Sequence, residues 1–229
     1  LPEVDKQRYL YGNWNVRPMG SQFFERGWVE EVSDIDPSEI VSTVRAFDFA
    51  GALKSDINPN PDYTASVRMH KLKDGTYYID EVTRTRIRPD KWKEFVLDLA
   101  LGDPLGTTYY IPQDPGPAAK RACNLFIREL ISHGLSARRM STNKSKLDRF
   151  RPFSSMAQSG GIKVKKRCAS DQENDIENDN RFYYKEMEAF DGKSSNAQHK
   201  HDDMCDATSD AFYALASKRG IVTDFSASL

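Results

Sequence analysis

The stretch VSTVRAFDFA, residues 41–50, decides the fold, because it has the pattern of a buried strand that ends in an acid, Asp48. Two further stretches follow, YTASVRMH at residues 63–70 and TYYIDEVTRTR at residues 76–86, in which apolar and polar side chains alternate. Asp74-Gly75 lies between them, and an Asp-Gly pair is a strong signal for a hairpin turn. The sequence therefore predicts three antiparallel strands, the first of which ends in a carboxylate.

Helices and further strands follow this hairpin. Pro89 suits the first position of a helix, where a missing N–H costs nothing, and Gly134 is placed to end a later helix. Residue spacing predicts the other elements: strands at 107–111 and 135–140, helices at 119–131, 143–158, 182–190 and 202–218, and a hairpin-like stretch at 162–167. This order predicts an α/β protein with a mixed sheet flanked by helices, which is the order of the ribonuclease H-like fold.

The composition is that of a folded domain. The chain has 229 residues, of which 38% are hydrophobic, so it can bury a core. Its apolar runs are too short to span a bilayer, and its start carries no signal-peptide pattern. The three cysteines are far apart in sequence and match no zinc or disulfide pattern, which favours a reducing compartment. The chain starts at Leu1 rather than at a methionine, so we expect a fragment of a longer protein.

Charge is unevenly distributed although the net charge is only −1. Residues 138–167 contain ten basic residues and one acid, Asp148, and residues 171–179 contain five acids and no base. A basic stretch beside an acid-rich site is the pattern of an enzyme that binds DNA phosphates. A solvated polar face is the ordinary alternative for such a run.

Asp48 is the first candidate site residue. Its strand neighbours Ala46, Phe47 and Phe49 are apolar, and an acid there is costly to bury unless it is paired or binds a metal ion. The alternative is a strand-end acid that points into solvent. The residue alone does not decide between the two interpretations.

Asp114 is the second candidate, because it follows the predicted strand at 107–111. Asp114-Pro115-Gly116 is a good turn sequence, so turn formation alone could explain the acid. Acids at the carboxyl ends of neighbouring strands converge, however, and open α/β sheets place their sites there. We therefore expect Asp114 to lie near Asp48.

The third group of acids begins the last predicted helix, in HDDMCD at residues 201–206. At about 100° per residue, Asp203 lies roughly 100° from the middle of the apolar side, and Asp202 and Asp206 lie roughly 160° from it. Asp203 is therefore predicted to lean over the sheet toward the other two acids. Asp202 is a helix cap or an outer metal ligand. Asp206 and Asp210 are predicted to form the solvent-exposed face.

These acids predict a particular chemistry. Carboxylates gathered in this way hold hard divalent cations, because Mg²⁺ and Mn²⁺ prefer oxygen ligands. The residues therefore predict a metal-dependent phosphoryl-transfer enzyme, and most simply a nuclease. His201 flanks the third group, where it is either a proton relay or an exposed loop histidine.

Five motifs occur in order along the chain. They are Phe47-Asp48-Phe49-Ala50-Gly51, Pro61-Asp62-Tyr63-Thr64-Ala65, Gln113-Asp114-Pro115-Gly116, Lys146-Leu147-Asp148-Arg149 and His201-Asp202-Asp203-Met204-Cys205-Asp206-Ala207. With these motifs, residues 41–215 resemble the C-terminal nuclease domain of the large terminase subunit of tailed bacteriophages, a ribonuclease H-like domain. Residues 1–40 resemble the segment that joins the packaging ATPase of those proteins to the nuclease. The acidic run at 171–179 departs from the family pattern.

The resemblance implies two parts, a linker from an upstream packaging ATPase at residues 1–40 and a nuclease domain at residues 41–229. It implies an endonuclease that cuts concatemeric double-stranded viral DNA during genome packaging in the host cell cytoplasm. It also implies the portal protein and the small terminase subunit as partners, and no membrane. The chain has no Gly-x-x-x-x-Gly-Lys-Ser/Thr phosphate loop, so we do not expect this stretch to hydrolyse ATP.

We hypothesise hydrolysis with two bound ions, Mg²⁺ or Mn²⁺. The residues predicted to be catalytic are Asp48, Asp114 and Asp203. The predicted metal ligands are Asp48, Asp114, Asp202 and Asp203. The residues predicted to contact DNA phosphates are Arg149, Lys163, Lys165 and Lys166, and contacts of this kind position DNA without reading its sequence.

Two other functions are compatible with the sequence. One is a junction resolvase or transposase-like nuclease of the same fold, which would share the carboxylates but prefer branched or terminal DNA. The other is a module without catalytic activity that grips DNA or docks to the portal, with a degenerate group of acids.

Overall fold

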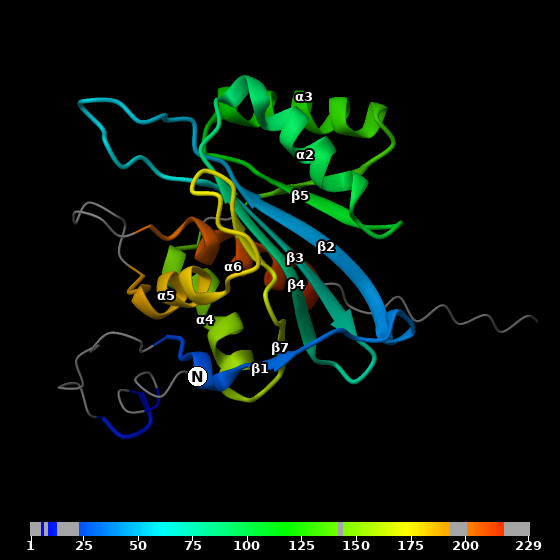
Figure 1. Cartoon of the computed structure of the whole chain (residues 1–229), viewed down its shortest axis with the longest axis vertical. Helices are drawn as coiled ribbons and strands as arrows, with labels where there is room; N and C mark the ends of the chain where they lie inside the picture. The colour runs from blue at the N-terminus through cyan, green and yellow to red at the C-terminus, as the bar shows by residue number, and fades with distance from the viewer. Residues whose placement is uncertain (1–5, 7–8, 13–22, 142–143, 193–200, 218–229) are drawn as a thin grey trace, which may run out of the picture.

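An eight-stranded mixed sheet forms the centre of the protein in the computed structural model, which describes residues 6, 9–12, 23–141, 144–192 and 201–217. The strand order is β1-β7-β4-β3-β2-β5-β6, and β8 also pairs with β4. The central strands are β2 (Ile40–Asp48), β3 (Thr64–Leu72) and β4 (Tyr77–Thr85), and each is antiparallel to the next. The predicted antiparallel trio is therefore confirmed (Figure 1).

The other strands extend the sheet on both sides of this trio. On the β2 side, β5 (Thr108–Pro112) and β6 (Ser136–Met140) are parallel to β2. On the β4 side lie β1 (Glu30–Val32), β7 (Ile162–Lys165) and β8 (Ala169–Asp171). The prediction of a hairpin-like stretch at 162–167 is wrong. Both β7 and β8 pair with β4 in parallel, and β1 takes the other edge of β7.

Helices cover the two faces of the sheet, as predicted (Figure 1). One face carries α2 (Trp92–Leu101) and α3 (Pro117–Ser132). The other face carries α4 (Lys146–Gln158), α5 (Arg181–Ala189) and α6 (Asp203–Ala216). Three short 3₁₀ turns complete the described elements: η1 (Arg26–Trp28), η2 (Pro37–Glu39) and η3 (Pro89–Lys91). No helix in the described ranges is long and apolar enough to cross a membrane.

Alternation along β2 decides which face receives Asp48. Val44 and Ala46 belong to the larger core, which α6 also enters, whereas Phe47 belongs to the smaller core under α2 and α3. Side chains two residues apart in a strand share a face. Asp48 therefore lies on the face that α6 covers, and the acids at the start of α6 can approach it.

Part of the predicted linker packs on the domain. Phe23 and Phe24 are buried in the larger core, where the Phe24 ring stacks on Phe153 with centroids 6.1 Å apart. Residues 30–32 add β1 to the sheet by pairing with β7. Most of residues 1–22 lie outside the described ranges, so the assignment of residues 1–40 as a linker remains a prediction.

Candidate metal centre

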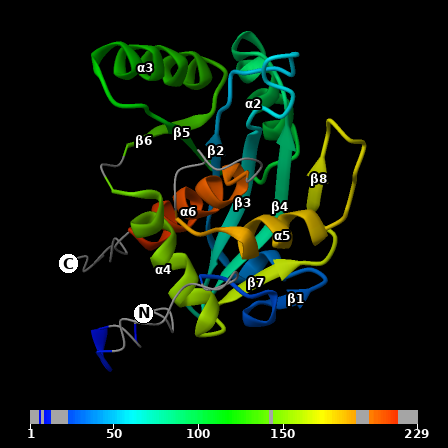
Figure 2. The same ribbon diagram turned by 90° about the vertical axis from the view of Figure 1, so that its left-hand side faces the viewer.

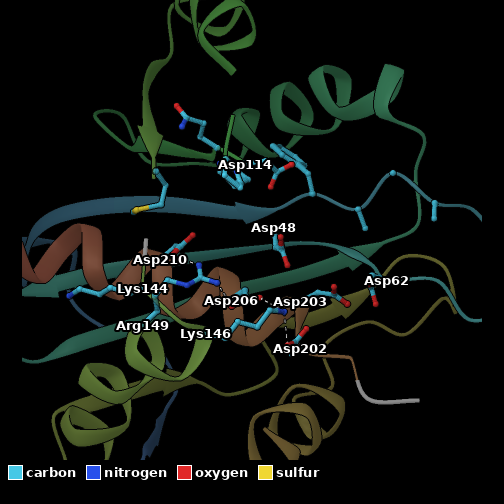
Figure 3. Close-up of a pocket in the computed structure, with 18 of the residues that line it drawn as sticks. Asp48, Asp62, Asp114, Lys144, Lys146, Arg149, Asp202, Asp203, Asp206 and Asp210 are labelled. Carbon is cyan, nitrogen blue, oxygen red and sulfur yellow. Dashed lines mark hydrogen bonds and ion pairs between the residues drawn. The ribbon is translucent and has the colours of Figure 1, made fainter. Parts of the chain in front are cut away.

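A cavity of about 480 Å³ opens where β2 and β5 end, between the loops that follow them and helices α4 and α6. We call it the acid cavity, because seven of its lining residues are aspartates. These are Asp48, Asp62, Asp114, Asp202, Asp203, Asp206 and Asp210. Three basic residues also line it: Lys144, Lys146 and Arg149. The structure thus brings together all four aspartates that the sequence predicts as metal ligands (Figure 3).

Asp48 lies between the two other sources of acids. Figure 3 shows it on β2, with Asp114 on one side and the α6 aspartates on the other. Desolvation raises the pKa of Asp48 well above its usual value, and the charges of Asp206 and Asp203 raise it further. Asp114 is exposed and follows β5, as predicted. A carboxyl that is crowded by like charges needs either a proton or a cation.

The start of α6 places Asp202 and Asp203 differently. Asp203 is buried, and its Oδ2 accepts a hydrogen bond from the Tyr63 backbone N–H at 3.0 Å. Asp202 occupies the N-cap position but makes no side-chain capping hydrogen bond. Its Oδ2 instead accepts a hydrogen bond from Lys146 Nζ at 2.6 Å. The predicted role of Asp202 as a helix cap is therefore not observed, and its role as an outer metal ligand stays a prediction.

The prediction that Asp206 and Asp210 form a solvent-exposed face is wrong, because both are buried where α4 packs against α6. Arg149 donates to Asp206 Oδ1 at 2.6 Å and to Asp210 Oδ1 at 3.0 Å. Lys146 Nζ lies 2.8 Å from Asp206 Oδ2. A helical wheel drawn from apolar residues cannot show a polar contact between helices. Lys146 and Arg149 are three residues apart and Asp206 and Asp210 are four apart, so each pair shares one face of its helix, and this is the signal that could have revealed the contact.

The residues predicted to bind DNA fall in two places. Arg149 is in the acid cavity, where its guanidinium pairs with aspartates. Lys163 and Lys165 lie on β7, which pairs with the first half of β4 at the end of the sheet away from Asp48. They form ion pairs there, at 3.3 Å with Asp74 and 2.8 Å with Asp34. Lys166 follows them directly, so the structure brings none of the three lysines to the cavity.

Asp62 is a cavity residue that the site prediction left out. The nearest ligand atoms of Asp62, His201 and Asp203 all lie within 4.8 Å of one another, a group that could hold a metal ion. His201 Nδ1 lies 3.6 Å from a carboxylate oxygen of each aspartate. A sequence signal for Asp62 does exist. It lies just before β3, and the start of an antiparallel neighbour must lie beside the end of β2.

The charges of the acid cavity do not balance. Burial raises the pKa of Asp210 to about 6 even though Arg149 lowers it, and burial also raises the pKa of Asp202 against the effect of Lys146. Together with Asp48, these groups hold protons more tightly than free aspartates do. A divalent cation would relieve this repulsion, and oxygen donors are the ligands that Mg²⁺ and Mn²⁺ prefer. The residues present therefore fit a divalent metal ion.

Solved structures with a similar fold include terminases and terminase nuclease domains. The large terminase of a thermophilic bacteriophage, in complex with ADP, has a TM-score of 0.63 at 14% identity, covering 96% of this chain. This chain covers only 50% of that terminase. The Mn-soaked, inhibitor-bound nuclease domain of human cytomegalovirus terminase has a TM-score of 0.53 at 12% identity, covering 77% of this chain and 84% of its own.

The magnesium-bound large terminase nuclease of thermophilic phage G20c has a TM-score of 0.50 at 15% identity, covering 86% of this chain and 98% of its own. At these identities the likeness shows a shared ribonuclease H-like fold, as predicted. The curated proteins contain no match to this chain. The model of one family, the terminase RNaseH-like domain, matches residues 45–215. Because this match spans most of the chain and all of the acid cavity, the chain belongs to the family of terminase ribonuclease H-like domains.

Proposed function

We propose that this domain is a metal-dependent endonuclease that cuts concatemeric double-stranded DNA during viral genome packaging. The observation that carries the proposal is the convergence of Asp48, Asp114 and the α6 aspartates in one open cavity. Membership of the terminase family supports a role in viral genome packaging. The Mn-soaked and magnesium-bound structures of similar fold support the metal dependence.

We assign two ions, Mg²⁺ or Mn²⁺, to the acid cavity. Asp48 is central among the acids, so it would be a ligand of this site. The other predicted ligands are Asp114, Asp202 and Asp203. When bound, such ions activate a water molecule and stabilise the leaving oxygen of a phosphodiester. The catalytic residues would be Asp48, Asp114 and Asp203, because they reach the cavity from three separate elements.

His201 and Asp62 extend this assignment. The buried Nδ1 of His201 has no hydrogen-bond partner among the described residues and faces Asp62 and Asp203 at 3.6 Å. It is therefore available either as a metal ligand with these two aspartates or as the proposed proton relay. Its Nε2 lies 3.1 Å from Asn60 Oδ1, which fixes the orientation of the ring.

Two bases of the cavity, Lys146 and Arg149, form ion pairs with its aspartates in the metal-free protein. Lys146 and Arg149 neutralise Asp202, Asp206 and Asp210 at distances of 2.6–3.0 Å. A DNA phosphate would compete with these aspartates for the charge of the Arg149 guanidinium. A bound cation that takes over the charge of Asp206 would therefore favour the predicted DNA contact of Arg149.

We propose that DNA phosphates also bind along β6. Arg138 and Arg139 are exposed on this edge strand, and neither has an ion pair among the described residues. The strand ends at Met140, which lines the acid cavity. Lys163 and Lys165, by contrast, are paired at the other end of the sheet. Arg138 and Arg139 are exposed, lie near the cavity and have no carboxylate partner among the described residues. They are therefore better placed to bind phosphates than Lys163 and Lys165, which are paired and far from the cavity.

Cleavage of plasmid DNA in Mn²⁺ tests the function. Asp48→Asn and Asp203→Asn should each abolish cleavage while the circular dichroism spectrum stays unchanged. Asp175→Asn is the matched control, because Asp175 is exposed and distant in sequence from the cavity motifs. Full activity in both site variants would end the proposal.

The choice of substrate separates the remaining interpretations. Linear, supercoiled and four-way-junction DNA should all be cut, with little sequence preference. Cleavage confined to the junction would favour a resolvase. The absence of any metal-dependent cleavage would favour a DNA-gripping or portal-docking module. The portal protein, the small terminase subunit and the host cell cytoplasm belong to the same proposal and rest on family membership.

A further inference from the structure

The acidic run at residues 171–179, here called the acidic loop, leads from the end of β8 to α5. Figure 2 shows β8 beside β4, on the side of the sheet away from β6. The Glu173 carboxylate binds two cations from different segments. Its Oε1 lies 2.6 Å from Lys54 Nζ in the β2–β3 loop, and its Oε2 accepts from Arg86 Nη1 at 2.6 Å. Both cations lower the pKa of Glu173 against the opposing effect of desolvation.

Arg86 connects the acidic loop to the acid cavity. Its side chain is 4% exposed, and its other two nitrogens, Nε and Nη2, each donate a hydrogen bond as well. Nε donates to the Pro61 carbonyl oxygen at 2.8 Å, and Nη2 donates to Asn60 Oδ1 at 2.7 Å. Its guanidinium lies 3.8 Å from the centroid of the Tyr63 ring. One buried side chain therefore holds the residues on both sides of Asp62.

The segment held by Arg86 reaches the candidate metal group directly. The Tyr63 backbone N–H donates to Asp203 Oδ2 at 3.0 Å. Asn60 Oδ1, which accepts from Arg86, also lies 3.1 Å from His201 Nε2. The chain of contacts thus runs from Glu173 through Arg86 to the three residues that could share an ion.

A second arginine repeats the arrangement. Arg84 donates to Asp171 Oδ2 at 2.8 Å, and its guanidinium lies 4.4 Å from the centroid of the same Tyr63 ring. Two acids of the acidic loop therefore each hold one arginine that packs on Tyr63. A buried arginine without such a partner would be an uncompensated charge, which is strongly destabilising.

We propose that the acidic loop is a clamp that positions Asp62 in the acid cavity, with Glu173 and Arg86 as its positioning residues. The inference rests on the proposed function only in that the cavity binds a divalent ion. The clamp fixes the segment 60–63, whose upstream loop is largely exposed.

Titration with Mn²⁺ by isothermal calorimetry tests the clamp without any catalytic step. Glu173→Gln should weaken Mn²⁺ binding by about tenfold, the lower end of the range for residues that orient metal ligands. Glu177→Gln is the matched control, since it removes the same charge from an exposed position of the same loop. The control should bind Mn²⁺ like the wild type.

Arg86→Lys is the second variant, because it keeps the buried charge and can still pair with Glu173. A lysine lacks the planar fork that reaches two acceptors and the ring at once. We expect the same weakening of Mn²⁺ binding, and in cleavage a lower kcat with an unchanged KM for DNA. If Glu173→Gln fails to fold, this variant decides the test.

The outcomes separate the clamp from the proposed function. Equal Mn²⁺ affinity in the wild type, Glu173→Gln and Arg86→Lys would overturn the clamp, even if all three cleave DNA. Weaker Mn²⁺ binding in both variants would support the clamp, even if the wild type cuts no DNA, in which case only the nuclease assignment fails.

Discussion

Replacing Asp210 by asparagine should make the metal-free protein more stable. Burial raises the pKa of Asp210 to about 6, from an ordinary value of 3.8. A carboxyl whose pKa is raised by folding holds its proton more tightly in the folded state, so its ionisation costs stability. This cost is absent below about pH 3.8, grows as the pH rises, and is complete above about pH 6.

The magnitude follows from the two pKa values. Their difference of roughly 2 pKa units, at about 1.4 kcal/mol each, corresponds to about 3 kcal/mol. For a domain of this size, that is a rise of roughly 6–12 °C in Tm. Asparagine resembles the neutral acid in shape, and its Oδ1 can still accept the hydrogen bond from Arg149 that Asp210 accepts at 3.0 Å.

Thermal and urea unfolding in EDTA, at pH 4 and pH 8, measure this effect. Asp210→Asn should exceed the wild type at pH 8, and the difference should shrink strongly at pH 4. Asp175→Asn is the control, because Asp175 is exposed and should change stability little at either pH. The reasoning would be refuted if the variant were less stable than the wild type at pH 8, or if its gain in stability were the same at pH 4 and pH 8.

Three other predictions concern metal and DNA. Asp48→Asn should lose the Mn²⁺-induced stabilisation of the wild type, about 2.7 kcal/mol at 100 times Kd; a full thermal shift in the variant would remove Asp48 from the ligands. Lys146→Met should lower stability in EDTA by about 1–3 kcal/mol, since carboxylates lose their partner, and Mn²⁺ should restore it in urea unfolding; an unrestored loss would contradict a cation site there. Arg138→Gln and Arg139→Gln should each reduce the slope of log K against log salt by about 0.9 in anisotropy titrations, whereas Lys165→Gln should not; equal slopes in all three would contradict the β6 path.

Local patterns predicted the centre of the molecule well. The alternation in residues 63–70 and 76–86 and the turn at Asp74-Gly75 correspond to β3, β4 and the hairpin between them. Pro89 begins η3, which leads directly into α2. Gly134 follows α3 with φ of 86°, the left-handed conformation expected beyond a helix end. Such signals act between neighbours in sequence, so they are readable without a fold.

Contacts between distant segments were harder to predict. β7 pairs with β1 and β4, which are far from it in sequence, and no local pattern distinguishes that arrangement from a hairpin. Asp62 belongs to the motif Pro61-Asp62-Tyr63-Thr64-Ala65, but its place in the candidate site depends on His201 and Asp203, which lie about 140 residues away. The pairing of distant segments follows from the packing of the whole chain.

The residue pattern alone predicts the antiparallel trio, and it places Asp48 and Asp114 at strand ends and Asp203 at the start of a helix, because the periods of strands and helices are local properties. The burial of Asp206 and Asp210, in contrast, depends on helix packing, since α4 covers a face of α6 that the apolar pattern of α6 leaves open. The same holds for the acidic loop, whose Asp171 and Glu173 bind the arginines beside Tyr63. Periodicity shows which side of a helix or strand is apolar. Its polar side can also be covered, but this depends on ion pairs between distant segments that meet only in the folded chain.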